Sequence, residues 1–432
     1  MLVVGGGPAG SAIATLLHRR GYRVVLVEKD THPRFHIGES LLPLTLPILA
    51  ELGVLEAVAA TGIPKYGAEF GRDRGRQSIY FAEAMDKIHP MAYQVRRAEF
   101  DGLLFDNAKA QGVEVHSETK VVAVDLEEEA HAVVETVDAS GRGRQWRARF
   151  VVDASGRDTL LARKLNLKRK NPRHQSAAIF GHFRGVARLP GRDAGNISIY
   201  WFPHGWMWLI PLPDAVVSVG AVCWPEYLKT RRCSLEAFLW QTIALCPAAQ
   251  SRMAEARLAG EARATGNYSY RATAMYGPRH LLVGDAFAFI DPVFSSGVHL
   301  ALSSAASGAA AIDGHLRHFT PKAKPLAAHA RRMNRGIDTV AWFIYRFTSP
   351  AMEQLFMNPR DVLGMKAALI SVLAGDVFRN TPTRVPLWLF KGVYYLTSLG
   401  LWSQAWTARR RRRNSAQIVF TGGTTPEDRS AV

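Results

Sequence analysis

Glycines near the start of the 432-residue chain are spaced to hold a phosphate. The loop reads Gly5, Gly6, Gly7, Pro8, Ala9 and Gly10. A G-x-G-x-x-G spacing between a strand and a helix lets a diphosphate approach the backbone at the helix start. Glu28, with Lys29 beside it, ends the next apolar run, where a carboxylate accepts a ribose hydroxyl. The pattern predicts a dinucleotide site; the alternative is a tight structural turn.

A second glycine–acid pair, Gly284-Asp285, follows the apolar run 280–283. An aspartate there can accept hydrogen bonds from a ribityl chain, and a helix after it supplies amide donors. Taken alone, an aspartate that caps a helix explains the pair better. Because the chain carries a single G-x-G-x-x-G unit, one dinucleotide held by two distant segments is expected. That arrangement favours FAD over NAD.

The elements around these loops predict an α/β fold. Short apolar strands at 2–4, 23–28, 150–153 and 280–283 suit a buried parallel sheet, whereas the alternating runs between 177 and 223 suit an antiparallel one. We expect a Rossmann-type FAD-binding lobe with an inserted antiparallel substrate lobe and a helical C-terminal region. The predicted segments are 1–165 (with 66–93 joining the sheet lobe), 166–275, 276–315, 316–421 and a disordered tail at 422–432.

Four further stretches of the sequence match motifs of a known protein family. Trp206–Pro211 reads W-x-W-x-I-P, 289–297 reads F-x-x-P-x-x-S-x-G, 33–43 contains Gly-Glu-Ser ending at Ser40, and Lys65 precedes Tyr-Gly-Ala-Glu-Phe. Together they resemble the flavin-dependent halogenases, whose FAD lobe is like that of hydroxybenzoate hydroxylase. The resemblance covers residues 1 to about 310.

The resemblance implies the chemistry and a role for each residue. FADH2 from a separate flavin reductase reacts with O2 to give a flavin hydroperoxide, chloride or bromide attacks it, and hypohalous acid reaches a catalytic lysine, here Lys65. Trp206 and Trp208 would shield the flavin from substrate, and Ser296 and Gly297 would bind halide. The residues expected to hold FAD are Gly5, Gly7, Pro8, Ala9, Gly10, Glu28, Lys29, Ser40, Arg97 and Asp285.

Each of these residues also has a structural explanation. Isolated tryptophans at this spacing are core aromatics more often than not, and a Ser-Gly pair at a helix start is an ordinary cap. A lone lysine is presumed to be a surface charge. For Lys65, its sequence context within the resemblance outweighs that presumption.

One position departs from the tryptophan halogenases, which carry a glutamate before the serine of the S-x-G segment. Here Phe294 stands in that place. A phenol or pyrrole is activated by its own heteroatom and needs less help from a protein base. The chain is therefore more similar to the branch that halogenates phenols, pyrroles and substrates tethered to a carrier protein, with the deprotonating base unassigned.

The charge favours acidic partners. Lys and Arg total 54 against 37 Asp and Glu, a net charge of +17, with basic runs at 142–149 and 164–173. No nucleic-acid motif accompanies them, so an acidic acyl carrier protein fits better than nucleic acid. Arg409–Arg413 follow an aromatic-rich stretch and could rest on an anionic membrane; the alternative is a packed helix with a solvated tail.

Three cysteines without a CxxC pair and the lack of a basic leader favour a cytoplasmic protein without a metal, with a contact on the inner membrane as a further option. Two other functions remain open. One is an aromatic hydroxylase or a prenyl-chain reductase of the same fold. The other is a membrane- or carrier-binding flavoprotein that does not halogenate.

Overall fold

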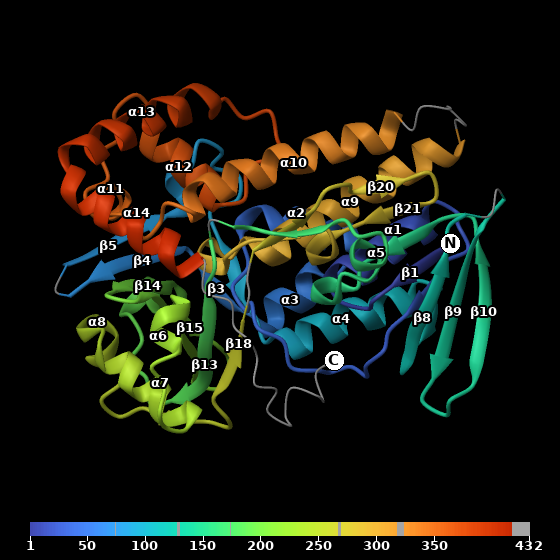
Figure 1. Ribbon diagram of the computed structural model, residues 1–432, viewed down its shortest axis with the longest axis horizontal. Helices are drawn as coiled ribbons and strands as arrows, with labels where there is room; N and C mark the ends of the chain where they lie inside the picture. Colours follow the sequence, from blue (N-terminus) through green and yellow to red (C-terminus); the bar gives the residue numbers. More distant parts are fainter. Residues whose placement is uncertain (74, 128–129, 173, 267–268, 318–323, 417–432) are drawn as a thin grey trace.

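The computed structural model describes all residues except 74, 128–129, 173, 267–268, 318–323 and 417–432. The predicted tail at 422–432 lies outside the described residues. Two large sheets lie side by side, and a layer of helices from the last third of the described chain covers them (Figure 1). This architecture confirms the predicted α/β class.

The first large sheet is the core of the dinucleotide lobe. Its order is β20 (Tyr276–Gly277), β21 (His280–Leu282), β11 (Val151–Asp153), β1 (Leu2–Val4), β2 (Val25–Val27) and β7 (Glu114–His116). All neighbours except β20 and β21 pair in parallel. Helices cover both faces of such a sheet, which explains the unbroken apolar runs. The predicted loops leave β1, β2 and β21 at the same edge.

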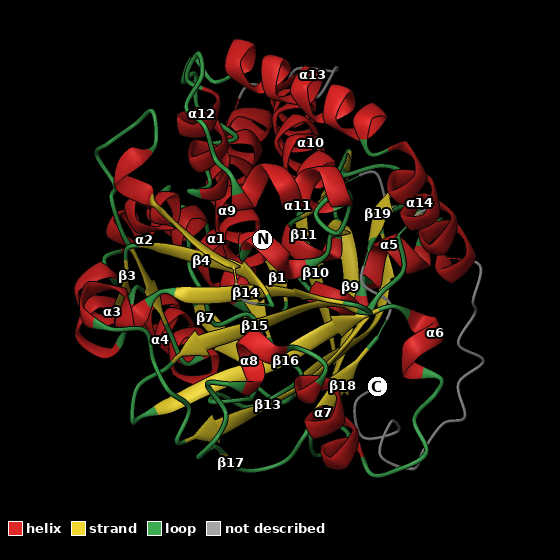
Figure 2. Ribbon diagram, turned by 90° about the vertical axis from the view of Figure 1, so that its left-hand side faces the viewer, coloured by secondary structure: helices red, strands yellow, loops and turns green. Residues whose placement is uncertain are grey.

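The second large sheet carries the aromatic motif. Its order is β17 (Arg257–Leu258), β13 (Ala177–Arg184), β16 (Val216–Cys223), β15 (Gly205–Pro211), β14 (Ile197–Phe202), β4 (Gly67–Arg72) and β5 (Gly75–Tyr80), with β18 (Arg263–Thr265) also on β13. The pairing is antiparallel except between β14 and β4, which run in parallel with Ile197 opposite Ala68. Segment 67–80 thus extends the inserted sheet (Figure 2).

Three small sheets complete the strands. They are β10 (Gly143–Ala148), β9 (Ala132–Asp138) and β8 (Thr119–Asp125); then β12 (Lys168–Lys170), β19 (Tyr270–Ala272) and β22 (Ala288–Phe289); and finally β3 (Ile63–Lys65) with β6 (Ala92–Gln94). The second of them joins strands from both sides of residue 276. It therefore ties the inserted segment to the second part of the dinucleotide lobe.

Helices of two groups surround the sheets. Those of the lobes are α1 (Pro8–Arg19), α2 (Leu46–Leu52), α3 (Leu55–Thr61), α4 (Arg97–Ala110), α5 (Leu160–Lys164), α6 (Pro225–Leu228), α7 (Leu235–Ala244), α8 (Pro247–Gln250) and α9 (Ser296–Arg317). The C-terminal group is α10 (Lys324–Ile344), α11 (Pro350–Met357), α12 (Met365–Leu373), α13 (Arg384–Gly400) and α14 (Trp402–Ala416). No described helix is long and apolar enough to cross a membrane.

Gly220 on β16 leaves the space that the Trp208 indole fills. A Cβ at Gly220 would lie 2.4 Å from the Trp208 ring and 2.5 Å from the Cβ of Phe180. Because both neighbours are buried, neither can move aside without opening a gap elsewhere. The glycine therefore fixes the position of one tryptophan of the W-x-W-x-I-P motif.

Replacement of Gly220 by alanine should lower the free energy of unfolding by ~1–3 kcal/mol, because the added methyl overpacks this site. Chemical denaturation measures the change. Gly143→Ala, also on a strand but with its nearest foreign atom 4.0 Å from the added Cβ, is the matched control and should change little. Equal stabilities for the two variants would show that Trp208 is not held by Gly220.

Candidate active site

The glycine loop combines close packing with one open position. Gly5 adopts a φ of +99°, and a Cβ there would meet the Ala154 carbonyl oxygen at 2.4 Å. A Cβ at Gly10 would lie 1.8 Å from the Gly5 oxygen. Gly7 differs: it caps α1, and its Cβ would meet only the Arg34 guanidinium, at 3.7 Å. The open space beside Gly7, at the start of α1, fits a diphosphate.

Glu28 braces this loop from the end of β2. Its carboxylate is 3% exposed and accepts hydrogen bonds from the backbone N–H groups of Gly6 and Asp30. The Arg34 guanidinium lies 3.7 Å away. Lys29 points elsewhere and pairs with Asp158 at 2.8 Å. Glu28 thus stands beside the glycine loop, as a ribose-binding carboxylate must.

The second predicted segment lies against the first. Gly284 and Asp285 form a turn after β21, and a Cβ on Gly284 would lie 3.2 Å from the Cβ of Ala9. Burial raises the pKa of Asp285 to about 6, although Arg157 and Arg97 oppose the rise. A recessed carboxyl next to the glycine loop suits the hydroxyls of a ribityl chain.

Arg97 holds a neighbouring loop in place. Its guanidinium forms two hydrogen bonds, of 2.8 and 2.9 Å, to the Asp101 carboxylate one turn along α4. A third N–H donates to the Ile37 carbonyl at 2.8 Å, just before Ser40. A buried bidentate pair of this kind has little freedom to move. The hydrogen bonds of the Arg97 guanidinium thus go to other residues of the protein. The Asp285 carboxylate is near enough to raise the pKa of Arg97.

These segments fit FAD. The open position at Gly7, the carboxylates of Glu28 and Asp285, and the free start of α9 surround one edge of the parallel sheet, the place where open α/β sheets bind dinucleotides. When bound there, FAD would supply the redox chemistry of the site.

Lys65 is the most unusual charged residue near this edge. Its side chain is 2% exposed at the end of β3, and its amine donates to the Ser40 hydroxyl at 2.8 Å and the Leu41 carbonyl at 3.1 Å. Among the described residues, no carboxylate forms an ion pair with it. Burial lowers its pKa to about 7. Ser40, predicted as a cofactor contact, is here the partner of the lysine.

The two tryptophans of the W-x-W-x-I-P motif are buried side by side on β15. Trp206 and Trp208 are each 4% exposed, and their ring centroids are 5.8 Å apart. The Trp206 indole N–H donates to the Asp291 carboxylate at 3.2 Å, and the Trp208 indole N–H donates to the Ser218 hydroxyl at 3.2 Å. Each indole is therefore anchored at its polar end, which keeps the ring orientation fixed.

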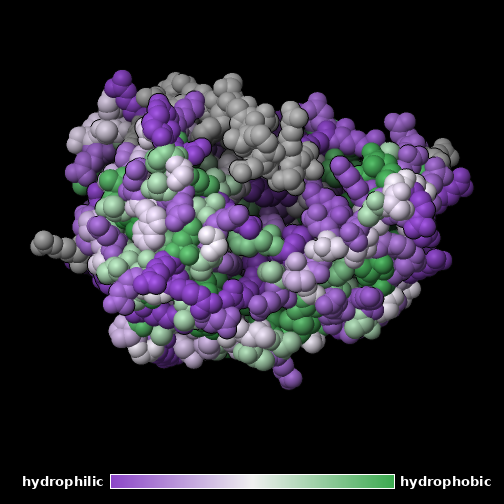
Figure 3. Space-filling view, turned by 90° about the horizontal axis from the view of Figure 1, so that it is seen from below, coloured by the Kyte–Doolittle hydropathy of each residue, from purple (hydrophilic) through white to green (hydrophobic). Residues whose placement is uncertain are grey.

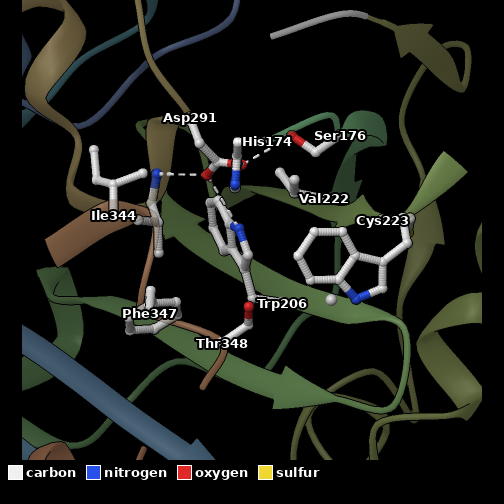
Figure 4. A pocket seen from close by; sticks show the side chains of 12 residues that line it. His174, Ser176, Trp206, Val222, Cys223, Asp291, Ile344, Phe347 and Thr348 are labelled. Atoms are coloured by element: carbon white, nitrogen blue, oxygen red, sulfur yellow. Dashed lines mark hydrogen bonds and ion pairs between the residues drawn. The ribbon is translucent and has the colours of Figure 1, made fainter. Parts of the chain in front are cut away.

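Asp291 is the centre of a buried polar cluster (Figure 4). Besides the bond from Trp206, its carboxylate accepts hydrogen bonds from the His174 ring at 3.1 Å and the Ser176 hydroxyl at 2.9 Å. The backbone N–H of Val293 donates to it as well. One carboxylate thus joins the inserted sheet to the loop before α9.

The predicted halide segment begins α9. Ser296 is its first residue, and nothing lies within 4 Å of a Cβ built on Gly297. Backbone N–H groups at a helix start and the open space beside them suit an anion. Phe294, just before, stacks on Phe356 with centroids 6.0 Å apart and meets Phe347 edge-on. Aromatic rings therefore occupy the surroundings of the position where tryptophan halogenases carry a glutamate.

A cavity of about 440 Å³ opens between the inserted sheet and the C-terminal helices. Trp201, Phe202 and Trp224 line its sheet side, and residues of α11 and α14 line the opposite side. It adjoins the small space beside Trp206, because Gly205, Trp224 and Thr348 line both. Its lining combines aromatic rings with polar groups, including the Arg72–Glu353 ion pair, so an aromatic molecule with polar substituents fits this volume.

Sequence reasoning missed several residues of this region. Asp291 was visible as the acid before the proline of the F-x-x-P-x-x-S-x-G segment, a signal that could have been used. His174, Arg157 and Phe347 carry no local signal, because each reaches the site through folding of a distant segment.

Comparisons with known proteins agree with this geometry. A family model described as an FAD binding domain matches residues 1–341. The chain is 36% identical over 317 residues to a tryptophan 2-halogenase of Chondromyces crocatus, covering 72% of this chain and 60% of that protein. It is 30% identical over 405 residues to a 1H-pyrrole-2-carbonyl-(peptidyl-carrier protein) chlorinase of Pseudomonas fluorescens, covering 88% and 89%.

A solved structure, described as a flavoprotein/dehydrogenase from Cytophaga hutchinsonii, superposes with a TM-score of 0.85. Its identity is 31%, over 92% of this chain and 99% of that one. The chain thus spans less than two thirds of the tryptophan 2-halogenase and most of the other two proteins. The family match confirms FAD as the cofactor, and the halogenase relatives favour that family over the hydroxylase and prenyl-reductase alternatives. The chain belongs to the flavin-dependent halogenase family.

Proposed function

We propose that this protein uses reduced FAD, O2 and chloride or bromide to halogenate an electron-rich aromatic ring, with Lys65 as the catalytic residue. The observation that carries the proposal is the buried Lys65 amine, which has only a hydroxyl and a carbonyl as its polar partners among the described residues. With a pKa lowered to about 7, a large share of this amine is uncharged at neutral pH.

The hydrogen bonds of Lys65 leave its reactive electrons free. A neutral amine has two N–H bonds and one lone pair, and Ser40 and Leu41 accept the two N–H bonds. The lone pair can then hold hypohalous acid by a hydrogen bond or take up its halogen, with an N–X bond formed, the O–X bond broken and water released. The aromatic ring next takes the halogen and loses one proton, which restores the amine.

Phe294 and its aromatic neighbours support a phenol or pyrrole as the substrate class. The Phe294 ring packs on Phe347 and Phe356. A ring that carries its own electron-donating heteroatom is reactive enough without a glutamate at this position. The cavity lined by Trp201 and Trp224 provides the apolar surface to hold it.

We further propose a cytoplasmic protein that receives FADH2 from a flavin reductase and its substrate on an acidic acyl carrier protein. The basic run 164–173 leads directly into His174, which lines the space beside Trp206. The run 142–149 lies on β10, in the sheet at the opposite end of the molecule from α11 and α14 (Figure 1). The first run is therefore the better placed of the two to receive a carrier.

FAD affinity should fall at least 100-fold in Gly7→Val, because the added side chain fills the space left for the diphosphate. Flavin fluorescence titration gives the affinity. Gly7 has a φ of −73°, which valine adopts, so the fold should persist. Gly392→Ala, on an exposed helix face with nothing within 4 Å, is the control. Unchanged affinity in Gly7→Val would place the cofactor elsewhere.

Halogenation should drop at least 100-fold in Lys65→Met, while FAD binding and peroxide release persist, since flavin chemistry does not need the amine. Product mass spectrometry and a peroxide assay separate the two. In the unmodified protein the rate should rise with pH, reach half its maximum near pH 7 and level off above it, because deprotonation frees the lone pair. A Lys65→Met variant that halogenates at the original rate would contradict the proposal.

The stability of the Lys65→Met variant serves as a control for misfolding. Since burial lowers the folded-state pKa below the unfolded value of 10.5, folding binds fewer protons, and stability is lost as pH falls from about 10.5 to about 7. Methionine removes that cost, so the variant should be more stable than the unmodified protein at pH 7, by ~1–4 kcal/mol. Lost activity in a stabilised variant cannot come from misfolding.

Reversing charge at Arg169 and Lys170, both exposed, should lower kcat/KM for a carrier-tethered aromatic about tenfold at low salt. The effect should fade as salt rises, and a free mimic should change less than twofold. Arg147→Glu with Arg149→Glu, in the other basic run, is the matched control. Efficient, salt-insensitive turnover of the free aromatic would discard the carrier as partner.

A further inference from the structure

Helices α13 and α14 leave an apolar surface without a protein partner. Of the thirteen large hydrophobic side chains that are exposed among the described residues, seven lie on these two helices. They are Val385, Trp388, Tyr395, Leu396, Leu399, Trp402 and Trp406, each 49–72% exposed. We propose that this α13–α14 face docks on an anionic lipid surface.

The exposed side chains of α13 form one stripe. The members Val385, Trp388, Tyr395, Leu396 and Leu399 follow the i, i+3, i+7 spacing of a single helix face. The opposite face holds the buried residues Leu387, Phe390 and Tyr394. One apolar side of the helix therefore packs on the core, and a second apolar side faces outward.

Helix α14 also carries exposed tryptophans, followed by arginines. Trp402, Trp406 and Arg410 are spaced four residues apart, and the Arg410 guanidinium lies 5.4 Å from the Trp406 ring centroid. On the neighbouring face, Ser403, Gln404 and Thr407 line the 440 Å³ cavity. One helix thus forms a wall of the candidate substrate cavity and an outward apolar surface.

Charge complementarity identifies the occupant as an anionic bilayer. From Arg384 to Ala416 the chain has no Asp or Glu and seven basic residues, namely Arg384, Lys391 and Arg409–Arg413. Tryptophan and tyrosine rings settle at the headgroup level, and basic side chains beside them attract anionic lipids. Because no described helix can span a bilayer, the helices would lie in the plane of its surface.

A lipid surface explains this face better than a protein partner does. Its apolar stripe offers few directed polar groups, and five of its seven basic residues follow the tryptophans in the sequence. A bilayer accepts such an arrangement without matching individual carboxylates. Elsewhere the surface differs: on the face seen in Figure 3, hydrophilic side chains separate smaller apolar patches. Docking would place the cavity wall formed by α14 beside lipid. That this cavity receives the substrate rests on the proposed function.

Vesicle flotation of the full-length, FAD-loaded protein tests the docking directly. The protein should float with vesicles of phosphatidylcholine and phosphatidylglycerol, and more weakly with phosphatidylcholine alone. The triple variant Trp388→Ser, Leu396→Ser and Trp402→Ser should partition at least tenfold less onto the anionic vesicles. Its targets are 66–72% exposed, so the melting temperature should hardly change.

Two exposed apolar residues outside α12–α14 provide the control. The variant Val122→Ser and Leu245→Ser removes the same kind of surface and should bind within twofold of the unmodified protein. Arg409→Ser with Arg410→Ser should weaken binding to anionic vesicles and leave the weak binding to neutral vesicles unchanged.

Several outcomes would overturn the docking. One is failure of the unmodified protein to float with anionic vesicles, and another is equal binding by the α13–α14 variant and the Val122–Leu245 variant. A dimer that the α13–α14 variant alone dissociates, or an acidic carrier protein that only this variant fails to bind, would assign the face to a protein instead. Flotation uses no substrate, so its result stands apart from whether the protein halogenates.

Discussion

Removal of the Lys65 amine from water is the constraint on which the active site depends. A charged ammonium in this position would need a carboxylate, and among the described residues its hydrogen-bond acceptors are only Ser40 and Leu41. The protein therefore lowers the pKa of the lysine, at a cost in stability that the large surrounding core can bear. The loop that contains Ser40 is held by Arg97, itself fixed by Asp101. Ser40, predicted as a cofactor contact, thus holds the amine of the lysine that we propose as catalytic.

The candidate site also depends on how the two large sheets are connected. FAD is expected at the edge of the parallel sheet, whereas the tryptophans stand on the inserted antiparallel sheet. Asp291 connects them, because it accepts hydrogen bonds from Trp206 and His174 while it precedes the turn into α9. A shift of either sheet would break this buried cluster, and buried polar groups left without partners are costly. The Asp291 carboxylate therefore fixes the position of Trp206 relative to the segment that leads into α9.

Much of the candidate site could be proposed from the sequence because its motifs are local. The glycine loop, Asp285 and the two tryptophans sit in short runs whose spacing fixes their geometry, and the parallel strands before them show as unbroken apolar segments. The parallel pairing of β14 with β4 could not be foreseen, since it joins residues 197 and 68 through contacts far apart in the chain. The burial of Lys65 and the cluster of His174 with Asp291 were equally hidden, because both arise from packing of distant elements. The apolar stretch at 386–406 was one run in the sequence but divides at Leu401 into two helices.

The pKa of the Lys65 amine is the measurement that tests the central claim most directly. Carbon-13 labelling at the lysine ε position, with Lys65→Met to assign the signal, follows its titration by NMR in the folded protein. The account predicts a midpoint near 7, well below the ordinary value of 10.5. A signal that titrates near 10.5 would contradict it, because the amine would then be charged at neutral pH and its lone pair closed to the halogen.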